Sequence, residues 1–143
     1  MNGLVFVDTN VLLYSVDQTD PEKQERAKAW CDWLWKTRRG RLSFQVLQEF
    51  YFNVWRRWPV AKGTARLQIA DLLSWKPLPA DGELLHFAWR LQDRFGLSFW
   101  DSLIVAAAKA SLCRILLSED FQSGQNIDGL LVVDPFLTQP DQL

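Results

Sequence analysis

Four acidic side chains stand where a divalent cation could be held. Asp8 directly follows one apolar run, and Asp120 follows another after two residues. Glu49 lies in the first turns of an expected helix, and Asp101 lies at the start of a second one. Carboxylates gathered in one cleft repel one another, so the pKa of each rises unless a cation neutralises them. Such a cluster of oxygen donors suits Mg²⁺, with Mn²⁺ as a substitute.

These four acids can meet only if the fold brings their segments to one place. Short apolar runs separated by helical patterns are typical of a parallel sheet covered by helices on both faces, here with four to five strands. Ligands of such sheets bind beyond the carboxyl ends of the strands, and the four acids map to that edge. The expected strands are residues 3–7, 42–44, 75–78, 114–118 and 130–133, and the expected helices are residues 21–37, 45–58, 61–73, 81–95 and a buried helix capped by Ser98 or Asp101.

Each acid taken alone also has a structural interpretation. Asp8 and Asp101 can be helix caps, since Asp accepts hydrogen bonds from unpaired N–H groups there. Glu49 can be an exposed helix residue, and Asp120 a turn former. It is the four acids together that favour a metal site. Because neighbouring residues of an extended segment point to opposite sides, only one of Glu119 and Asp120 can face that site.

Other chemistries lack the residues they need. The one histidine, His86, lies inside an amphipathic helical pattern, which argues against a Ser-His-Asp triad or a zinc site. The chain contains neither GxxxxGK[ST] nor a GxGxxG after its first strand, so the usual nucleotide-binding loops are missing. Cys31 and Cys113 are predicted to be free thiols in a reducing cytosol.

Length and composition fit a single domain of 143 residues. No apolar stretch approaches the roughly 20 residues of a membrane-spanning helix, and the N-terminus does not resemble a signal peptide, so we expect a cytoplasmic protein. The net charge of −1 hides an asymmetry, because residues 23–76 carry twelve Lys and Arg against four Asp and Glu. This basic half is either a solvated surface or a surface for a polyanion.

Four blocks in order resemble the PIN-domain family, most closely its VapC-type ribonuclease toxins. The blocks are VDTNVLLY, QEFYFNV, SFWDSLIVAAA, and ILLSEDFQ followed by LLVVDPF. The resemblance implies one PIN domain over residues 1–136, with a loosely ordered tail at 137–143. It also implies a Mg²⁺-dependent endoribonuclease, with Asp8, Glu49, Asp101 and Asp120 as catalytic and metal-binding acids. Asp120 is chosen over Glu119 from its place in the motif.

The resemblance also implies supporting residues and partners. Thr9, Asn10 and Ser118 would orient the carboxylates through hydrogen bonds. A VapC-type toxin would bind RNA, a small antitoxin protein and a second copy of itself, and the exposed aromatic residues expected on the early helices suit such partners. Basic residues must hold the RNA, and Trp100 either stacks on a base or packs into the core. The candidate RNA contacts are Lys36, Arg38, Arg39, Arg41, Arg56, Arg57 and Trp100.

Two other functions stay open. One is a PIN nuclease that is not a toxin and acts in RNA maturation or on DNA. The other is a catalytically silent PIN module that binds RNA or protein.

Overall fold

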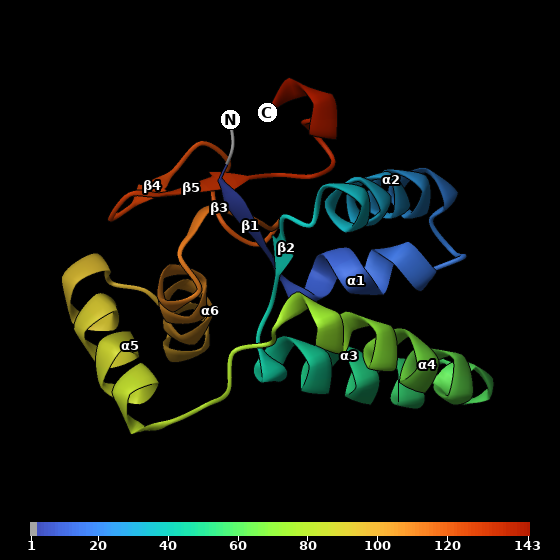
Figure 1. The fold of residues 1–143 in the computed structure, drawn as a ribbon, viewed down its shortest axis with the longest axis horizontal. Helices are drawn as coiled ribbons and strands as arrows, with labels where there is room; N and C mark the ends of the chain where they lie inside the picture. The colour runs from blue at the N-terminus through green and yellow to red at the C-terminus, as the bar shows by residue number, and fades with distance from the viewer. Residues whose placement is uncertain (1–2) are drawn as a thin grey trace.

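The first apolar run forms the strand around which the sheet is built. A computed structural model describes residues 3–143, and Figure 1 shows its sheet with helices on both sides. The strands are β1 (Leu4–Val7), β2 (Gly40–Arg41), β3 (Cys113–Leu117), β4 (Asn126–Ile127) and β5 (Leu130–Val133). The helices are α1 (Thr9–Val16), α2 (Pro21–Thr37), α3 (Phe44–Arg57), α4 (Lys62–Leu72), α5 (Gly82–Phe95) and α6 (Phe99–Ala110), with short 3-10 helices η1 (Pro59–Ala61), η2 (Leu73–Trp75) and η3 (Pro140–Gln142).

The sheet is mostly parallel. Its strand order is β2-β1-β3-β5-β4, with β2, β1, β3 and β5 parallel and β4 antiparallel to β5. The three-layer fold with a parallel sheet is therefore confirmed. The antiparallel edge strand β4 was not expected, because two residues inside a turn-rich loop leave no readable strand pattern.

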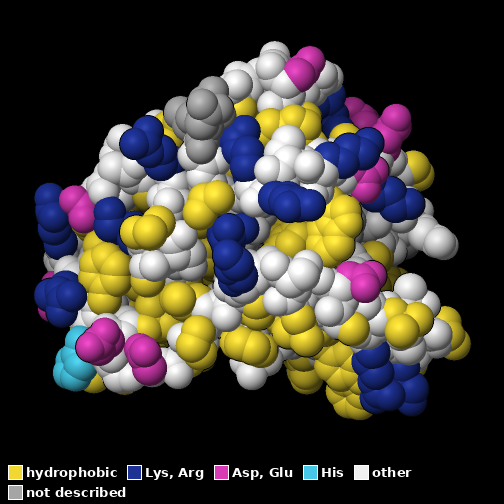
Figure 2. Space-filling model, viewed as in Figure 1, with side chains coloured by type: hydrophobic (Ala, Val, Ile, Leu, Met, Phe, Trp, Pro, Cys, Tyr) yellow, Lys and Arg dark blue, Asp and Glu magenta, His cyan; other side chains and the backbone are white. Residues whose placement is uncertain are grey.

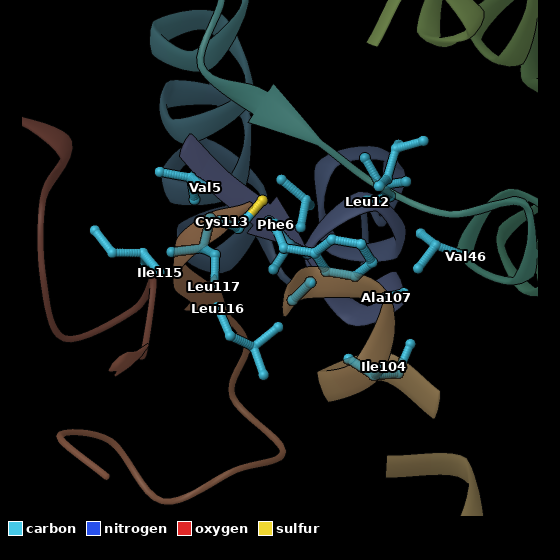
Figure 3. Packing of buried hydrophobic residues seen from close by; sticks show 14 of the residues in the cluster. Val5, Phe6, Leu12, Val46, Ile104, Ala107, Cys113, Ile115, Leu116 and Leu117 are labelled. Atoms are coloured by element: carbon cyan, nitrogen blue, oxygen red, sulfur yellow. The ribbon is translucent and has the colours of Figure 1, made fainter. Parts of the chain in front are cut away.

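The core fills both faces of the sheet. In Figure 1, α2 lies on one side of the strands, and α5 and α6 lie on the other. Figure 3 shows Phe6 of β1 pointing toward Leu12 of α1, Val46 of α3 and Ala107 of α6, while Val5 points the other way. All five side chains are fully or almost fully buried. Burial on both faces explains why β1 is apolar at successive positions.

Side-chain caps fix where the helices begin. Asp20 accepts a hydrogen bond from the Lys23 amide (3.2 Å) at the start of α2, as its Asp-Pro sequence predicts. At α6 the cap is Ser98, whose hydroxyl accepts a hydrogen bond from the Asp101 amide (3.1 Å). The carboxylate of Asp101 is therefore not used as a cap.

Two expected strands are wrong. Residues 42–44 do not form a strand, because the Ser43 side chain caps α3 and the helix begins at Phe44. At 75–78, Trp75 ends η2, and Leu78 makes only an isolated bridge to Ser43. The prolines on either side of Leu78 have no N–H to donate, so the pairing cannot extend into a ladder.

The C-terminal segment lies against α2. The indole of Trp30 donates hydrogen bonds to the carbonyl oxygens of Pro135 (3.1 Å) and Thr138 (3.0 Å), and η3 follows. The loose order expected for residues 137–143 stays a prediction. Within residues 3–143, none of the helices combines the length and the apolar character needed to cross a membrane.

A tight contact at β2 yields a stability prediction. A Cβ added at Gly40 would come within 2.6 Å of the ring of the buried Trp75, whereas one added at Gly63 in α4 meets nothing within 4 Å. We expect Gly40→Ala to lower the free energy of unfolding by about 1–3 kcal/mol, because the ring must move out of a packed site. The matched variant Gly63→Ala should be neutral or stabilising. Urea denaturation measures both, and equal effects would contradict the contact.

Candidate functional site

Asp8 is fixed by the end of β1. Its amide donates a hydrogen bond to the Leu117 carbonyl of β3 (3.1 Å), so the carboxylate leaves the sheet from a rigid strand end. The Asp8 carboxylate is buried, with 7% of the residue exposed. It accepts hydrogen bonds from the Thr9 amide (2.7 Å) and from the Ser118 hydroxyl (2.8 Å). These donors compensate part of the free energy needed to bury a charge.

Asn10 joins Asp8 to Asp120. Its side-chain amide donates a hydrogen bond to the Asp120 carboxylate (3.0 Å) and lies 3.3 Å from the Ser118 oxygen and 3.5 Å from an Asp8 oxygen. The Asp120 amide donates to the same Ser118 oxygen (3.1 Å). One amide and one hydroxyl therefore lie between two like charges from β1 and from the loop after β3.

Glu49 is brought to the same place by α3. One of its carboxylate oxygens accepts a hydrogen bond from the Thr9 hydroxyl (3.1 Å), and the other accepts one from the Gln45 side chain (2.8 Å). Gln45 was not among the predicted site residues. Its signal was its spacing, since residues four apart on a helix lie side by side.

An ion pair separates the roles of Glu119 and Asp120. Glu119 pairs with Lys23 of α2 (2.8 Å), and the Lys23 ammonium also lies over the rings of Tyr14 (4.6 Å) and Phe136 (4.9 Å). Glu119 therefore points to α2, whereas Asp120 points to Asn10. The structure thus brings Asp120, and not Glu119, to Asp8.

Asp101 lies at the same edge of the sheet but outside this hydrogen-bond network. Helix α6 packs on β3 and joins it through a short turn, so the start of α6 lies near the carboxyl end of β3. The Asp101 side chain is half-buried there. Among the described residues, no hydrogen bond or ion pair involves its carboxylate. The structure therefore brings three of the four predicted acids together and places the fourth nearby without contact.

Burial and like charge act together on Asp8. Burial raises the pKa of Asp8 from its ordinary 3.8 to about 6, with smaller contributions from the charges of Asp120 and Glu49. The hydrogen bonds from Ser118 and Thr9 act in the opposite direction. Within residues 3–143, no basic side chain forms an ion pair with Asp8, so its charge is compensated by dipoles alone.

The donor set suits a hard cation, although the side chains are not gathered around a common point. Carboxylate and hydroxyl oxygens are the ligands that Mg²⁺ prefers, and a buried carboxylate without a cationic partner is stabilised by one. In the part of the chain that the structure describes, no three His, Cys, Asp or Glu side chains are arranged to hold a metal ion. The acids are instead joined through Thr9, Asn10 and Ser118.

The expected basic contacts fall into two groups. Lys36, Arg38 and Arg41 lie at the end of α2 and on β2, and Arg38 is exposed. Arg39 is half-buried, donates a hydrogen bond to the Gly3 carbonyl (2.7 Å) and lies over the ring of Trp33 (4.7 Å), so it packs against the protein. Arg56 and Arg57 end α3, roughly 10 Å along the helix from Glu49.

Trp100 stands in the first turn of α6 beside Asp101. Its side chain is 65% exposed and contacts Phe99 edge-on, with 5.2 Å between the ring centroids. It therefore does not pack into the core. An exposed ring next to the acidic edge is available to stack on a base.

The cysteines take no part in this site. Cys31 and Cys113 are free thiols, as predicted. Burial raises the pKa of each thiol to about 12, so neither is a thiolate nucleophile at neutral pH. His86 lies on α5 against Trp89.

Comparisons with known proteins give a family and a shared fold. A family model described as the PIN domain matches residues 5–123, and no curated protein matches the chain. A structure of FitAB bound to a DNA fragment has 20% identity, covering 93% of this chain and 96% of the other, with a TM-score of 0.69. A toxin–antitoxin complex from Klebsiella pneumoniae has 16% identity over 92% and 97%, with a TM-score of 0.63. The sarcin-ricin loop cleaving toxin VapC20 of Mycobacterium tuberculosis has 22% identity over 78% and 86%, with a TM-score of 0.58.

Burial of Asp8 predicts how stability depends on pH. Because its folded-state pKa of about 6 lies above the ordinary 3.8, the folded state binds the proton more tightly than the unfolded chain does. The stability from this group is therefore present below about pH 4 and lost as pH rises through about 6. In Asp8→Asn this position cannot ionise. Without divalent cations, the free energy of unfolding of the variant should therefore rise relative to that of wild type by up to about 3 kcal/mol as the pH increases from below about 4 to above about 6.

Urea denaturation in a chelator at several pH values measures this difference. The matched variant Asp93→Asn removes an exposed carboxylate from α5. A similar pH-dependent gain in that variant would attribute the effect to net charge. A flat difference between Asp8→Asn and wild type would contradict the burial of a charged Asp8.

Proposed function

Because this chain belongs to the PIN domain family, we propose that it is a Mg²⁺-dependent endoribonuclease and the toxin of a toxin–antitoxin pair. The observation that carries the proposal is the buried carboxylate of Asp8 at the carboxyl edge of the sheet. It is joined to Glu49 through Thr9 and to Asp120 through Asn10. The names of similar structures support the rest of it, since one is a toxin that cleaves RNA at the sarcin-ricin loop and another is a toxin–antitoxin complex.

The proposed metal ligands are the four acids. Asp8 and Asp101 would hold the ion directly, with Glu49 and Asp120 completing the acidic pocket. A bound Mg²⁺ supplies a water of lowered pKa and draws charge from the phosphate oxygens. Thr9, Asn10 and Ser118 orient the carboxylates through the hydrogen bonds described above.

Apart from the phosphate that is cut, the RNA must be held by residues outside this pocket, because the acids repel its phosphates. The exposed Trp100 beside Asp101 offers a base a stacking surface that tolerates any sequence. Arg56 and Arg57 at the end of α3 would contact phosphates, which makes binding weaken as salt rises.

One observation favours a catalytically silent binding module as the second candidate. Within residues 3–143 the potential ligands do not surround a common point, and N–H and O–H donors join the acids. Such a module would bind RNA without cutting it. The two candidates differ in cleavage.

Cleavage of RNA tests the proposal. With Mg²⁺ the wild-type chain should cut RNA that has single-stranded regions, and a chelator should stop it. Asp8→Asn and Glu49→Gln should lower the rate by at least about 100-fold, since each removes a charge from the proposed metal site. The matched variant Asp93→Asn should cut like wild type. Full activity in Asp8→Asn would contradict the mechanism. If the wild-type chain does not cut RNA, the silent module is favoured. If it cuts only DNA, the proposed substrate is wrong and the chain is a DNA nuclease.

An exposed hydrophobic surface offers a place for protein partners. Phe52 and Trp55 of α3 are about half exposed, and their ring centroids lie 6.1 Å apart. Val60 and Leu67, on the adjoining η1 and α4, are also exposed. Clusters of exposed aromatic residues are typical of protein interfaces. We propose that this α3–α4 surface serves binding of the antitoxin and of a second copy of the chain.

Growth of an expressing cell tests the toxin role. Expression of the wild-type chain should arrest growth, and Asp8→Asn should restore it because RNA is no longer cut. Co-expression of the small protein encoded beside the chain should also restore growth. That rescue should be lost in Phe52→Ser/Trp55→Ser, because its binding surface is removed. Normal growth with active wild-type enzyme would identify a nuclease that is not a toxin.

A further inference from the structure

A hollow on the open edge of the sheet combines positive charge with two tryptophans in contact. It has a volume of about 620 Å³ and lies between the end of α2, β2 and η2. Its three cationic side chains have no acidic residue among their neighbours in the lining, which consists of Trp35, Arg38, Gly40, Arg41, Ser74, Trp75 and Lys76. Figure 2 shows Lys and Arg side chains gathered over β2 in the middle of the view, with hydrophobic surface beside them.

The floor of this hollow is rigid. The Trp75 ring is buried and lies against Gly40, where even a Cβ would not fit. Trp35 lies on Trp75, with 5.5 Å between the ring centroids and an interplanar angle of 39°. Trp35 is nevertheless 46% exposed, so a supported aromatic surface faces solvent.

The cations around this floor are available to a ligand. Arg41 uses one guanidinium nitrogen on the Gly40 carbonyl (2.7 Å) and, more weakly, on the Arg38 carbonyl (3.4 Å). This anchors the guanidinium and leaves its other N–H groups without acceptors in the described part of the chain. Over residues 3–143, the charged groups of Arg38 and Lys76 also have no hydrogen-bond or ion-pair partner.

Two of the three cations stand at positions with left-handed backbone. Arg38 ends α2 at φ 58°, and Lys76 follows η2 at φ 57°. Glycine is the residue that best tolerates this left-handed conformation at a helix end. At both rims of the hollow a cationic side chain therefore stands on backbone that glycine tolerates best.

We infer that this hollow is a second binding site for single-stranded RNA, with a base stacked on Trp35 and a phosphate held by Arg38, Arg41 and Lys76. Proteins that bind single strands without sequence preference offer aromatic rings on which bases stack, beside cations that hold the phosphates. Gly40 is in register with Val5, three residues before Asp8, so this part of the lining lies about 10 Å from Asp8 along the strand direction. The inference deepens the proposed function, because it names where the substrate is held outside the acidic site.

A second hollow of similar volume differs in the charge of its lining. It has a volume of about 660 Å³, and its lining includes Asp81, Glu83, His86 and Arg90. That mixture of signs does not indicate one class of ligand. The hollow at β2 carries one sign only, which fits a polyanion.

Binding without cleavage tests this inference. The probe is a fluorescein-labelled single-stranded RNA of about ten nucleotides, titrated with the full chain in a chelator and followed by anisotropy. Trp35→Ala should raise the dissociation constant roughly tenfold, because the stacking surface is lost. The matched variant Trp89→Ala removes an equally exposed ring (44%) from α5 and should leave the constant unchanged.

Two glycine variants separate binding from folding. Arg38→Gly and Lys76→Gly should keep or raise the melting temperature, because glycine suits the left-handed backbone. Each should nevertheless weaken RNA binding and reduce the slope of log K against log salt by about 0.7, as expected for one lost phosphate contact with a single strand. Arg90→Gln is the matched loss of charge from α5 and should not change that slope.

The outcomes distinguish this site from the proposed enzyme. Unchanged affinity and slope in Trp35→Ala and Arg38→Gly would overturn the site, even if RNA is cleaved and Asp8→Asn abolishes cleavage. Affinity that depends on Trp35 in a chain that never cleaves would support the site and overturn the ribonuclease. Variants that keep RNA affinity but no longer bind the co-expressed antitoxin would make the hollow a protein interface and overturn the inference.

Discussion

The burial of one carboxylate at a strand end is the constraint on which the candidate site depends. Asp8 leaves the sheet where β1 is still held by β3, so its position is set by the ladder rather than by a loop. A buried charge requires compensation, and here it comes from three donors on two separate segments: Thr9, Asn10 and Ser118. The same residues also form hydrogen bonds with other parts of the site, Thr9 with Glu49 and Asn10 with Ser118 and Asp120. The hydrogen bonds that compensate the charge of Asp8 therefore hold Glu49 and Asp120 at the same edge.

The strand β1 also connects the acidic site with the basic hollow. β1 pairs with β2 on one side and with β3 on the other, so the acids and the basic hollow are two regions of a single rigid sheet. The acids and the cations lie at different places along the strand direction, because Gly40 of β2 is in register with Val5 and not with Asp8.

Much of the fold could be predicted from the sequence, because the patterns that indicate its strands and helices are local. Continuous apolar runs identified β1, β3 and β5, and Asp20-Pro21 identified the start of α2. The two wrong strands also have local causes, whereas the choice between Glu119 and Asp120 depends on a residue far away in the chain. Ser43 was expected in a strand, but its hydroxyl accepts a hydrogen bond from the Val46 amide and caps α3. Leu78 pairs with Ser43 only through an isolated bridge, because the prolines on both sides have no N–H to extend the pairing. Nothing local says that Glu119 pairs with Lys23 of α2, yet that ion pair leaves Asp120 to face Asn10.

The contact between Gly40 and Trp75 has a consequence for how such a sequence can evolve. The two positions are 35 residues apart in the chain, yet the ring occupies the space that any side chain at position 40 would need. Substitutions there are therefore epistatic: a larger residue at 40 becomes acceptable only after the ring at 75 has been replaced by a smaller one. Sequence change at β2 is therefore expected to involve both positions, and the order of the two changes decides how stable the intermediate is.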